Sequence, residues 1–259
     1  MTTPRRPGFP VTLPGAGNAI AKPARQSAVA SGVAPRVSVG VGMDSSAVRT
    51  RMVQRLAAGG VTSAAVLAAM GLVERHRFVD SALVNQAYED TSLPIGLGQT
   101  ISKPNVVARM CELLLGAPVA QTGNGLGRVL EIGTGCGYQA AVLSHLAREV
   151  YTIERLRGLH DKARANLRPF RLATVHLLLG DGMQGYASGA PYAAIIAAAG
   201  GNAVPQAWCD QLVVGGRLVA PIAMEGGQQM LLVIDKTLQG LKQSVLEPVH
   251  FVPLKSGIA

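Results

Sequence analysis

Short apolar runs alternate with helical patterns through the second half of this 259-residue chain. A short apolar run bounded by glycine or polar residues predicts a buried strand, and the segments between the runs repeat their apolar residues at helical spacing. The predicted strands are 128–132, 149–154, 174–179, 192–198 and 212–221, and the predicted helices between them are 138–147, 156–167 and 205–211. This alternation is typical of α/β proteins, so we expect a doubly wound, mostly parallel sheet with right-handed crossovers.

The segments on either side complete the expected fold. An N-terminal helical segment is predicted, with helices from Ser45 or Ser46 to Gly59–Gly60, from Thr62 or Ser63 to Gly71, through Ala87, and from Pro104 to Leu115. Two late strands, 229–236 and 245–254, are expected to join the sheet as antiparallel neighbours. The segment 91–104 (TSLPIGLGQTISKP) is interrupted by Gly and Pro and predicts a long irregular loop, a feature that is often functional.

Composition limits the class of protein. Hydrophobic residues make up 48% of the chain and charged residues 15%, as in a globular protein. The longest apolar run, 192–201, is about half of the ~20 residues that a membrane span needs. Pro and Gly break the segment after Arg5 and Arg6, so it is not the apolar stretch of a secretory signal. We therefore expect a cytoplasmic protein without a membrane partner.

The cysteines and histidines form no recognisable framework. The three cysteines have no paired spacing, and the five histidines form no ligand pair at helical spacing. This pattern predicts neither a disulfide framework nor a metal site.

Positive charge is concentrated near the N-terminus. The formal net charge is +9, and residues 1–40 contain five Arg or Lys and no acidic residue. Because this segment is rich in Pro, Gly, Ala and Ser, we expect a flexible basic tail over 1–42 and a single domain over 43–259. The tail is interpreted either as a solvated extension or as a contact to an anionic surface. Aromatic residues do not interleave with the basic ones, which argues against a nucleic-acid partner.

A glycine turn is the sharpest chemical signal. Gly133, Gly135 and Gly137 in VLEIGTGCGY follow a predicted strand and precede a predicted helix. Without side chains, the backbone can pass close beneath a ligand at the helix N-terminus. The spacing is GxGxG rather than the GxGxxG of dinucleotide enzymes, and a tight strand–helix turn alone would also explain it.

Two acidic residues end the next two strands. Glu154 lies 17 residues after Gly137, where a carboxylate can accept hydrogen bonds from both hydroxyls of a ribose. Asp181 lies between two glycines after the third strand, where it can accept from an amine such as adenine N6. Because carboxyl ends of parallel strands meet at one edge, the three signals together predict a ligand that contains adenosine. The alternative for Glu154 is a side chain that is exposed to solvent or paired with Arg155. The alternative for Asp181 is a residue that only shapes a turn.

Further motifs make a resemblance specific. They are RFVD (77–80), LPIGLGQTIS (93–102), VLEIGTGCGY (129–138), GDG (180–182), GGRLVAPI (215–222) and FVPL (251–254). In these motifs the chain resembles class I S-adenosylmethionine-dependent methyltransferases, and more narrowly the protein-L-isoaspartate O-methyltransferase family. The loop that contains GQTIS distinguishes this family from other methyltransferases, and the similarity extends from about Met52 to Leu254.

The resemblance implies a Rossmann-like methyltransferase fold and a repair activity. The enzyme would transfer a methyl group from S-adenosylmethionine to the α-carboxylate of L-isoaspartyl residues in damaged peptides and proteins, its expected partners. By motif position, Ser102 corresponds to the family's active-site serine. The implied cofactor contacts are Thr100, Ile101, Glu131, Gly133, Gly135, Gly137, Glu154, Asp181 and Gly182. The implied substrate contacts are Pro94, Ile95, Gly96 and Ser102.

Three departures from the family pattern are visible. Cys136 stands where the family often has Ser, and Ala193 where it has Asp. Gly200–Gly201 replace the Ala and Pro that often follow the fourth strand, so we expect a looser pocket there.

Other functions compete with this interpretation. A methyltransferase acting on the amino groups of RNA would carry an Asn/Asp-Pro-Pro-aromatic motif after the fourth strand, where this chain has 198–201 (AAGG). The GxGxG spacing argues against an NAD-linked oxidoreductase. A methyltransferase for a small molecule, or a non-catalytic protein that keeps the cofactor pocket, stays open at this point.

Overall fold

The computed structural model describes residues 46–123 and 125–259. The expected tail over 1–42 lies outside the described residues, as does the start of the expected domain over 43–259. Within the described ranges, no helix is long and apolar enough to cross a membrane.

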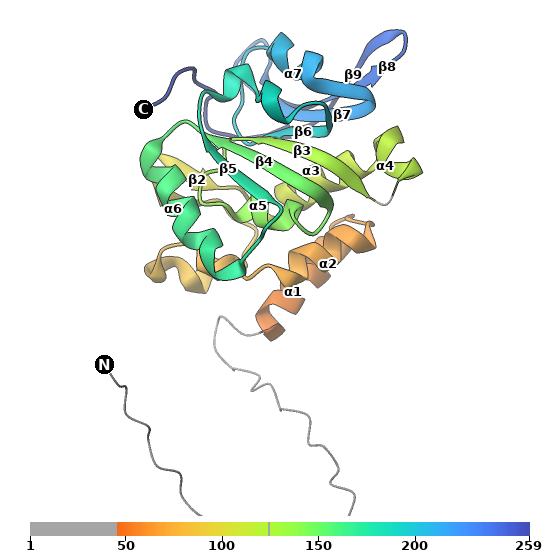
Figure 1. Cartoon of the computed structure of the whole chain (residues 1–259). Coiled ribbons are helices and arrows are strands. Elements are labelled where there is room, and N and C mark those ends of the chain that lie inside the picture. The colour runs from red at the N-terminus through yellow and green to blue at the C-terminus, as the bar shows by residue number, and fades with distance from the viewer. Residues whose placement is uncertain (1–45, 124) are drawn as a thin grey trace, which may run out of the picture. The chain divides into compact units, whose positions relative to one another are not determined.

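In the part of the chain that the structure describes, seven strands form one sheet in the order β5-β4-β3-β6-β7-β8-β9. The strands are β3 (Leu126–Ile132), β4 (Ala147–Glu154), β5 (Val175–Leu179), β6 (Tyr192–Ala197), β7 (Leu212–Ala223), β8 (Gln229–Thr237) and β9 (Gly240–Val249). Neighbours from β5 to β7 run parallel, and β8 and β9 are antiparallel. The predicted doubly wound, mostly parallel sheet with late antiparallel strands is confirmed (Figure 1).

The sheet changes winding direction at β3. From β3 the chain adds β4 and β5 on one side, and it then returns to place β6 on the other side. The carboxyl end of the sheet at such a point is where open α/β sheets bind ligands. The six residues of β6 are all buried, as expected for a parallel strand that is covered on both faces.

Helices cover both faces of the sheet. They are α1 (Ser46–Ala58), α2 (Ala64–Leu72), α3 (Pro104–Leu115), α4 (Pro118–Thr122), α5 (Tyr138–Leu143), α6 (Arg157–Leu167) and α7 (Gln206–Gln211). Figure 1 shows α5 and α6 on one side of the sheet, with α1 and α2 beyond them, and α7 on the other side. The larger apolar core lies on the side of the N-terminal helices, and a smaller core surrounds Trp208 of α7.

Most predicted helices are present, with shifted ends. The predicted bounds of α3 are confirmed: Pro104 is its first residue and Gly116 caps it. The prediction that Gly71 stops α2 is wrong, because the helix continues to Leu72 and the N–H of Val73 bonds Ala69. Gly71 lacks the positive φ that would turn the chain out of the helix.

The end of one helix and the bounds of one strand also differ from the prediction. The helix expected over 138–147 ends at Leu143, because Ala147 already pairs with Leu126 and begins β4. The last strand was expected over 245–254 but spans β9, because a tight turn between Thr237 and Gly240 starts the pairing earlier. Residues 250–254 are therefore free to leave the sheet and run across its end.

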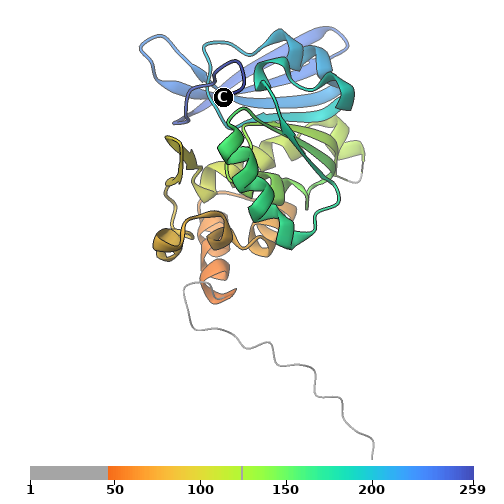
Figure 2. The same ribbon diagram turned by 60° about the vertical axis from the view of Figure 1, so that its left-hand side comes forward.

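The segment expected to be an irregular loop contains a hairpin. β1 (Leu93–Gly96) pairs antiparallel with β2 (Gln99–Ile101). Leu97 and Gly98 connect them with φ of 53° and 70°, and two positive φ values match the twist of a tight hairpin. Figure 2 shows this hairpin region (olive) and the N-terminal helices (orange) on the same side of the molecule.

Candidate active site

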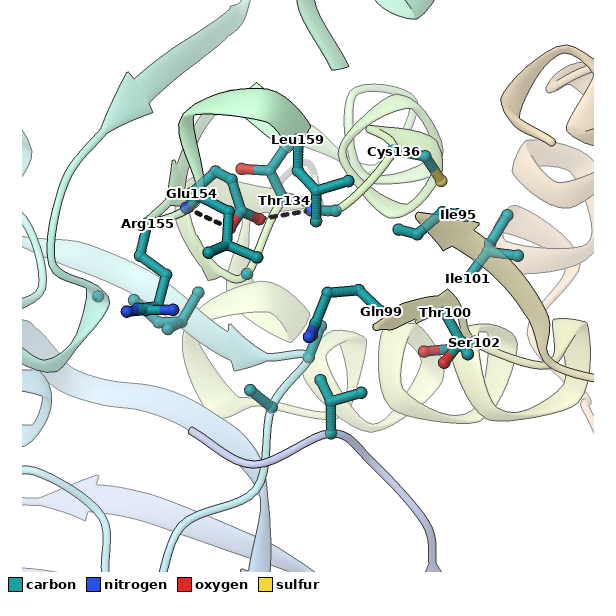
Figure 3. A pocket seen from close by; sticks show the side chains of 18 of the residues that line it. Ile95, Gln99, Thr100, Ile101, Ser102, Thr134, Cys136, Glu154, Arg155 and Leu159 are labelled. Carbon is teal, nitrogen blue, oxygen red and sulfur yellow. Dashed lines mark hydrogen bonds between the residues drawn. The ribbon is translucent and has the colours of Figure 1, made fainter. Parts of the chain in front are cut away.

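A pocket of about 430 Å³ lies at the carboxyl end of the sheet. Its lining includes the glycine turn after β3, Glu154 at the end of β4, and Ala198 and Ala199 after β6. Residues 97–102 of the hairpin region and 252–255 near the C-terminus form further walls (Figure 3). The volume lies in the range of small-molecule sites.

The glycine turn passes close beneath the pocket because its three glycines have no side chains. Gly133, Gly135 and Gly137 have φ of 90°, 57° and 93°, which other residues rarely adopt. A Cβ on Gly135 would lie 3.2 Å from Cδ1 of Ile95 in the hairpin. A Cβ on Gly137 would lie 3.0 Å from Leu167, so this glycine allows the turn to pack closely against α6. Gly137 itself lies outside the pocket lining.

Glu154 lines the pocket and braces the glycine turn. Its Oε2 accepts a hydrogen bond from the N–H of Gly135 at 2.9 Å, and its Oε1 accepts from the N–H of Leu156 at 2.9 Å. The residue is 4% exposed. No salt bridge joins it to Arg155 in the described residues, so the alternative of a solvent-exposed or Arg155-paired Glu154 is wrong. Each carboxylate oxygen retains acceptor capacity for a ligand.

Asp181 lies next to the pocket rather than in its lining. Its Oδ1 accepts from the N–H of Met183 at 2.9 Å, and its Oδ2 accepts from the N–H of Gly257 at 2.8 Å. The following residue, Gly182, does line the pocket. A Cβ on Gly182 would lie 2.6 Å from Cγ2 of Ile132, so a glycine is required at this edge.

The hairpin region contributes four predicted residues to the pocket. They are Ile95, Thr100, Ile101 and Ser102, whereas Pro94 and Gly96 lie outside the lining. Thr100 and Ser102, which are labelled in Figure 3, both line the pocket. The hairpin thus brings two hydroxyls to the wall that faces the glycine turn.

A buried arginine fixes the backbone at Ser102. Nη2 of Arg75 donates to the carbonyl of Ser102 at 2.7 Å, and its Nε donates to the carbonyl of Ala87 at 2.7 Å. The guanidinium lies 4.6 Å from the ring centroid of Tyr138, within cation–π distance. Arg75 is fully buried, so it connects the N-terminal helical segment with the pocket wall from behind.

Glu131 lies beneath the pocket and not in its lining. It is fully buried, and its Oε2 accepts from Oγ1 of Thr152 at 2.5 Å. Oγ1 of Thr152 lies 2.6 Å from Oγ1 of Thr134, which lines the pocket, so hydroxyl contacts connect Glu131 with the pocket lining. Burial raises the pKa of Glu131 to about 8, so the carboxyl is largely neutral at neutral pH.

The sequence reasoning missed Gln139. It lies in the first turn of α5 and lines the pocket, and its buried amide interacts with the carboxyl of Glu131, whose pKa it lowers against the larger effect of burial. Its signal was a lone polar residue in an apolar helix directly after the glycine turn (YQAAVL). An amide in the pocket lining has both donor and acceptor atoms, so it suits a polar ligand group.

The structure shows where the three departures from the family pattern lie. Cys136 lines the pocket, and burial raises the pKa of its thiol to about 11, so the thiol stays protonated. Ala193 is buried within β6, outside the pocket lining. The expected loosening at Gly200 is wrong: its N–H donates to Val252 at 2.9 Å and its carbonyl accepts from Leu254 at 2.7 Å. A Cβ on Gly200 would lie 2.6 Å from Nε2 of Gln229, so glycine allows the C-terminal segment to close this end.

Comparison with known proteins identifies the family. The model of the family described as protein-L-isoaspartate(D-aspartate) O-methyltransferase matches residues 47–259. The chain belongs to this family. The match extends beyond the last quoted motif and includes the final residues of the chain.

Bacterial members of the family are close in sequence. A protein-L-isoaspartate O-methyltransferase of Methylibium petroleiphilum is 62% identical over 221 residues, which cover 84% of this chain and 81% of the relative. One of Leptothrix cholodnii is 59% identical, with 86% and 78% covered.

Solved structures of the family share the fold. One protein-L-isoaspartate O-methyltransferase superposes with a TM-score of 0.72 at 27% identity, covering 81% of this chain and 67% of the other. A second, from Plasmodium falciparum and in complex with S-adenosyl-L-homocysteine, has a TM-score of 0.66 at 23% identity, with 80% and 98% covered.

Proposed function

We propose that the protein is a repair enzyme that transfers a methyl group from S-adenosylmethionine to the α-carboxylate of L-isoaspartyl residues in damaged peptides and proteins. The family match over residues 47–259 carries this proposal. The pocket supports it, because the family motifs converge there from the hairpin and from the ends of β3, β4 and β5.

The residues present fit the cofactor. The backbone at Gly135 leaves room that a Cβ would fill, and the carboxylate of Glu154 lines the same pocket. The amide of Gln139 in the pocket lining carries both a donor and an acceptor for a polar group. We assign the ribose hydroxyls to Glu154 and the adenine edge to Asp181 and Gly182, with Thr100 and Ile101 as a wall.

The methyl transfer requires no acid or base catalysis by protein side chains. When bound, S-adenosylmethionine supplies an electrophilic methyl group on a positively charged sulfur. The substrate carboxylate, with an ordinary pKa near ~4, is already ionised at pH 7 and attacks without a general base. The positive and negative charges neutralise each other during transfer, so a dry pocket favours the reaction.

Ser102 is the residue that we assign to the substrate. Its hydroxyl lines the pocket while its backbone carbonyl accepts a hydrogen bond from Arg75, so the backbone that carries the side chain is held in place. One hydroxyl donor orients a carboxylate at a modest cost in nucleophilicity, and alignment is worth up to ~7–11 kcal/mol. Cys136 is no nucleophile in this scheme, because its thiol is protonated.

Methyl transfer to matched peptides tests the proposal. Labelled S-adenosylmethionine is incubated with the protein and either an L-isoaspartyl peptide or its L-aspartyl isomer. We expect label in the isoaspartyl peptide only, as a base-labile ester. Equal labelling of both isomers, or of neither, would contradict the proposal.

A further inference from the structure

The last nine residues, 251–259, form a segment that we call the strap. It begins where the side-chain amide of Gln229 bonds both backbone groups of Phe251, with distances of 2.7 and 3.1 Å. Backbone hydrogen bonds of Val252 and Leu254 with Gly200 then fix it beside the end of β6. The strap therefore leaves the antiparallel part of the sheet and enters the ligand-binding edge.

The far end of the strap is fixed on the other side of the glycine turn. The N–H of Gly257 donates to Oδ2 of Asp181 at 2.8 Å, and its carbonyl accepts from Nε of Arg155 at 3.0 Å. The N–H of Ala259 donates to the carbonyl of Arg155 at 2.9 Å, and its carbonyl accepts from the N–H of Arg157 at 2.8 Å. The strap thus bridges the ends of β6 on one side and of β5 and β4 on the other.

The part of the strap between these anchors forms one wall of the pocket. Residues 252–255 belong to the pocket lining. Glu154 is 4% exposed, and its neighbour Arg155 holds the strap. A ligand that contacts Glu154 and Asp181 therefore lies against the strap, whose Gly257 already occupies one acceptor of Asp181.

The side chain of Arg155 contacts the strap through a hydrogen bond. In the described part of the chain it forms no salt bridge, and its one side-chain hydrogen bond joins it to Gly257. Residues 255–259 are exposed and contribute nothing to the two apolar cores. Segments held by a few solvent-accessible hydrogen bonds open without global unfolding.

We propose that the strap is the gate through which S-adenosylmethionine exchanges, and that Arg155 is the positioning residue that holds the gate closed. This inference rests on the proposed function for the identity of the ligand. Weakening the hold of Arg155 on Gly257 raises the population of the open state, so ligand enters and leaves faster.

Stopped-flow binding of S-adenosylhomocysteine measures both rates. Trp208 is the single tryptophan, and its indole N–H donates to the carbonyl of Gly182 in the pocket lining at 2.8 Å, so its fluorescence reports on the site. Release of tritiated ligand gives the dissociation rate independently. The variants are Arg155→Ala, which removes the contact, and Arg155→Lys, which retains a donor.

A second variant acts through the backbone. Gly257 has φ of +76°, and a Cβ added there would have nothing within 4 Å, so Gly257→Ala strains the strap without a clash. Gly60→Ala is its matched control, since Gly60 has φ of +101°, equal space and no place in the pocket lining. Arg157→Ala controls for Arg155→Ala, because Arg157 contacts the strap through its backbone N–H, which alanine keeps.

We expect Arg155→Ala and Gly257→Ala to raise the association and the dissociation rate, each by about tenfold, the factor that one lost hydrogen bond, or one alanine strained at positive φ, allows. Arg155→Lys should restore most of the difference, and both controls should match the wild type. Faster dissociation with an unchanged association rate would mean that the strap contacts the bound ligand but does not control its entry. Two unchanged rates would mean that the strap does not affect ligand exchange. Either result overturns the proposal. If the wild type binds S-adenosylhomocysteine but methylates no isoaspartyl peptide, the proposed function fails while the kinetic result on the strap stands.

Discussion

The N–H of Gly135 donates a hydrogen bond to the carboxylate of Glu154, with 2.9 Å between N and Oε2. This contact joins the ends of two adjacent parallel strands and fixes the carboxylate against the turn that lies beneath the pocket. The same carboxylate thus holds the glycine turn and faces the ligand.

Glu154→Ala should weaken the binding of S-adenosylmethionine. The change removes hydrogen bonds from a charged acceptor to the ribose, roughly 1–3 kcal/mol, and it releases the N–H of Gly135. Titration calorimetry measures the loss. Glu149→Ala is the control, because Glu149 lies on the same strand but pairs with Arg128 at 2.8 Å and is absent from the pocket lining. Unchanged affinity in Glu154→Ala would place the ribose elsewhere.

Ser102→Ala should lower kcat by about 10- to 100-fold, with cofactor affinity nearly unchanged. The hydroxyl orients the substrate carboxylate, and loss of alignment reduces turnover rather than cofactor binding. Steady-state kinetics with an isoaspartyl peptide and calorimetry with the cofactor separate the two effects. Ser92→Ala, an exposed serine outside the pocket lining, should behave as wild type. A methyl group trapped on Ser102 in mass spectra would contradict an orienting role.

Arg75→Met should destabilise the protein by roughly 2–4 kcal/mol, because it leaves the carbonyls of Ala87 and Ser102 without their buried donor. Urea unfolding measures the change. The neighbouring Arg77 is half exposed and pairs with Glu74 at the surface, so Arg77→Met should cost less than about 1 kcal/mol. Equal effects of the two substitutions would mean that the buried contacts of Arg75 add nothing.

Glu131→Gln should change how stability depends on pH. Burial raises the pKa of Glu131 from an ordinary value of 4.5 to about 8, so between these values the folded state holds a proton that the unfolded state has lost. This contribution to stability is complete below pH 4.5 and is lost as the pH rises through 8.

The stability of Glu131→Gln relative to wild type should therefore increase steadily from about pH 4.5 to about pH 8 and then level off. Urea unfolding of both proteins from pH 5 to pH 9 provides the comparison, and the difference between them cancels the other titrating groups. A difference that does not vary with pH would show that Glu131 titrates normally.

The parts of the site that have local sequence patterns could be predicted. Pro104 at the first position of α3 and the glycine following its last turn mark both ends of that helix. The strand–glycine–helix pattern and the acidic residue one strand later located Gly135 and Glu154, because parallel strands end at the same edge.

The parts that depend on distant contacts could not be predicted. Arg75 lies in RHRF, which has the composition of a solvated surface, yet the residue is fully buried. The hairpin turn begins with Leu97, a residue that rarely adopts positive φ, so the segment resembled a loop. The hydrogen bonds that fix the strap use the strap's own backbone groups, which have no residue-specific signature.

Repair of an isoaspartyl peptide tests the central claim most directly. The purified protein, S-adenosylmethionine and one L-isoaspartyl peptide are incubated, and mass spectrometry with chromatographic separation of the isomers follows the peptide over time. We predict a transient methyl ester, then the succinimide formed by loss of methanol, and then a rising fraction of the normal L-aspartyl peptide as the cycle repeats. A stable methyl product, or a peptide that stays fully isoaspartyl while the cofactor is consumed, would contradict the account.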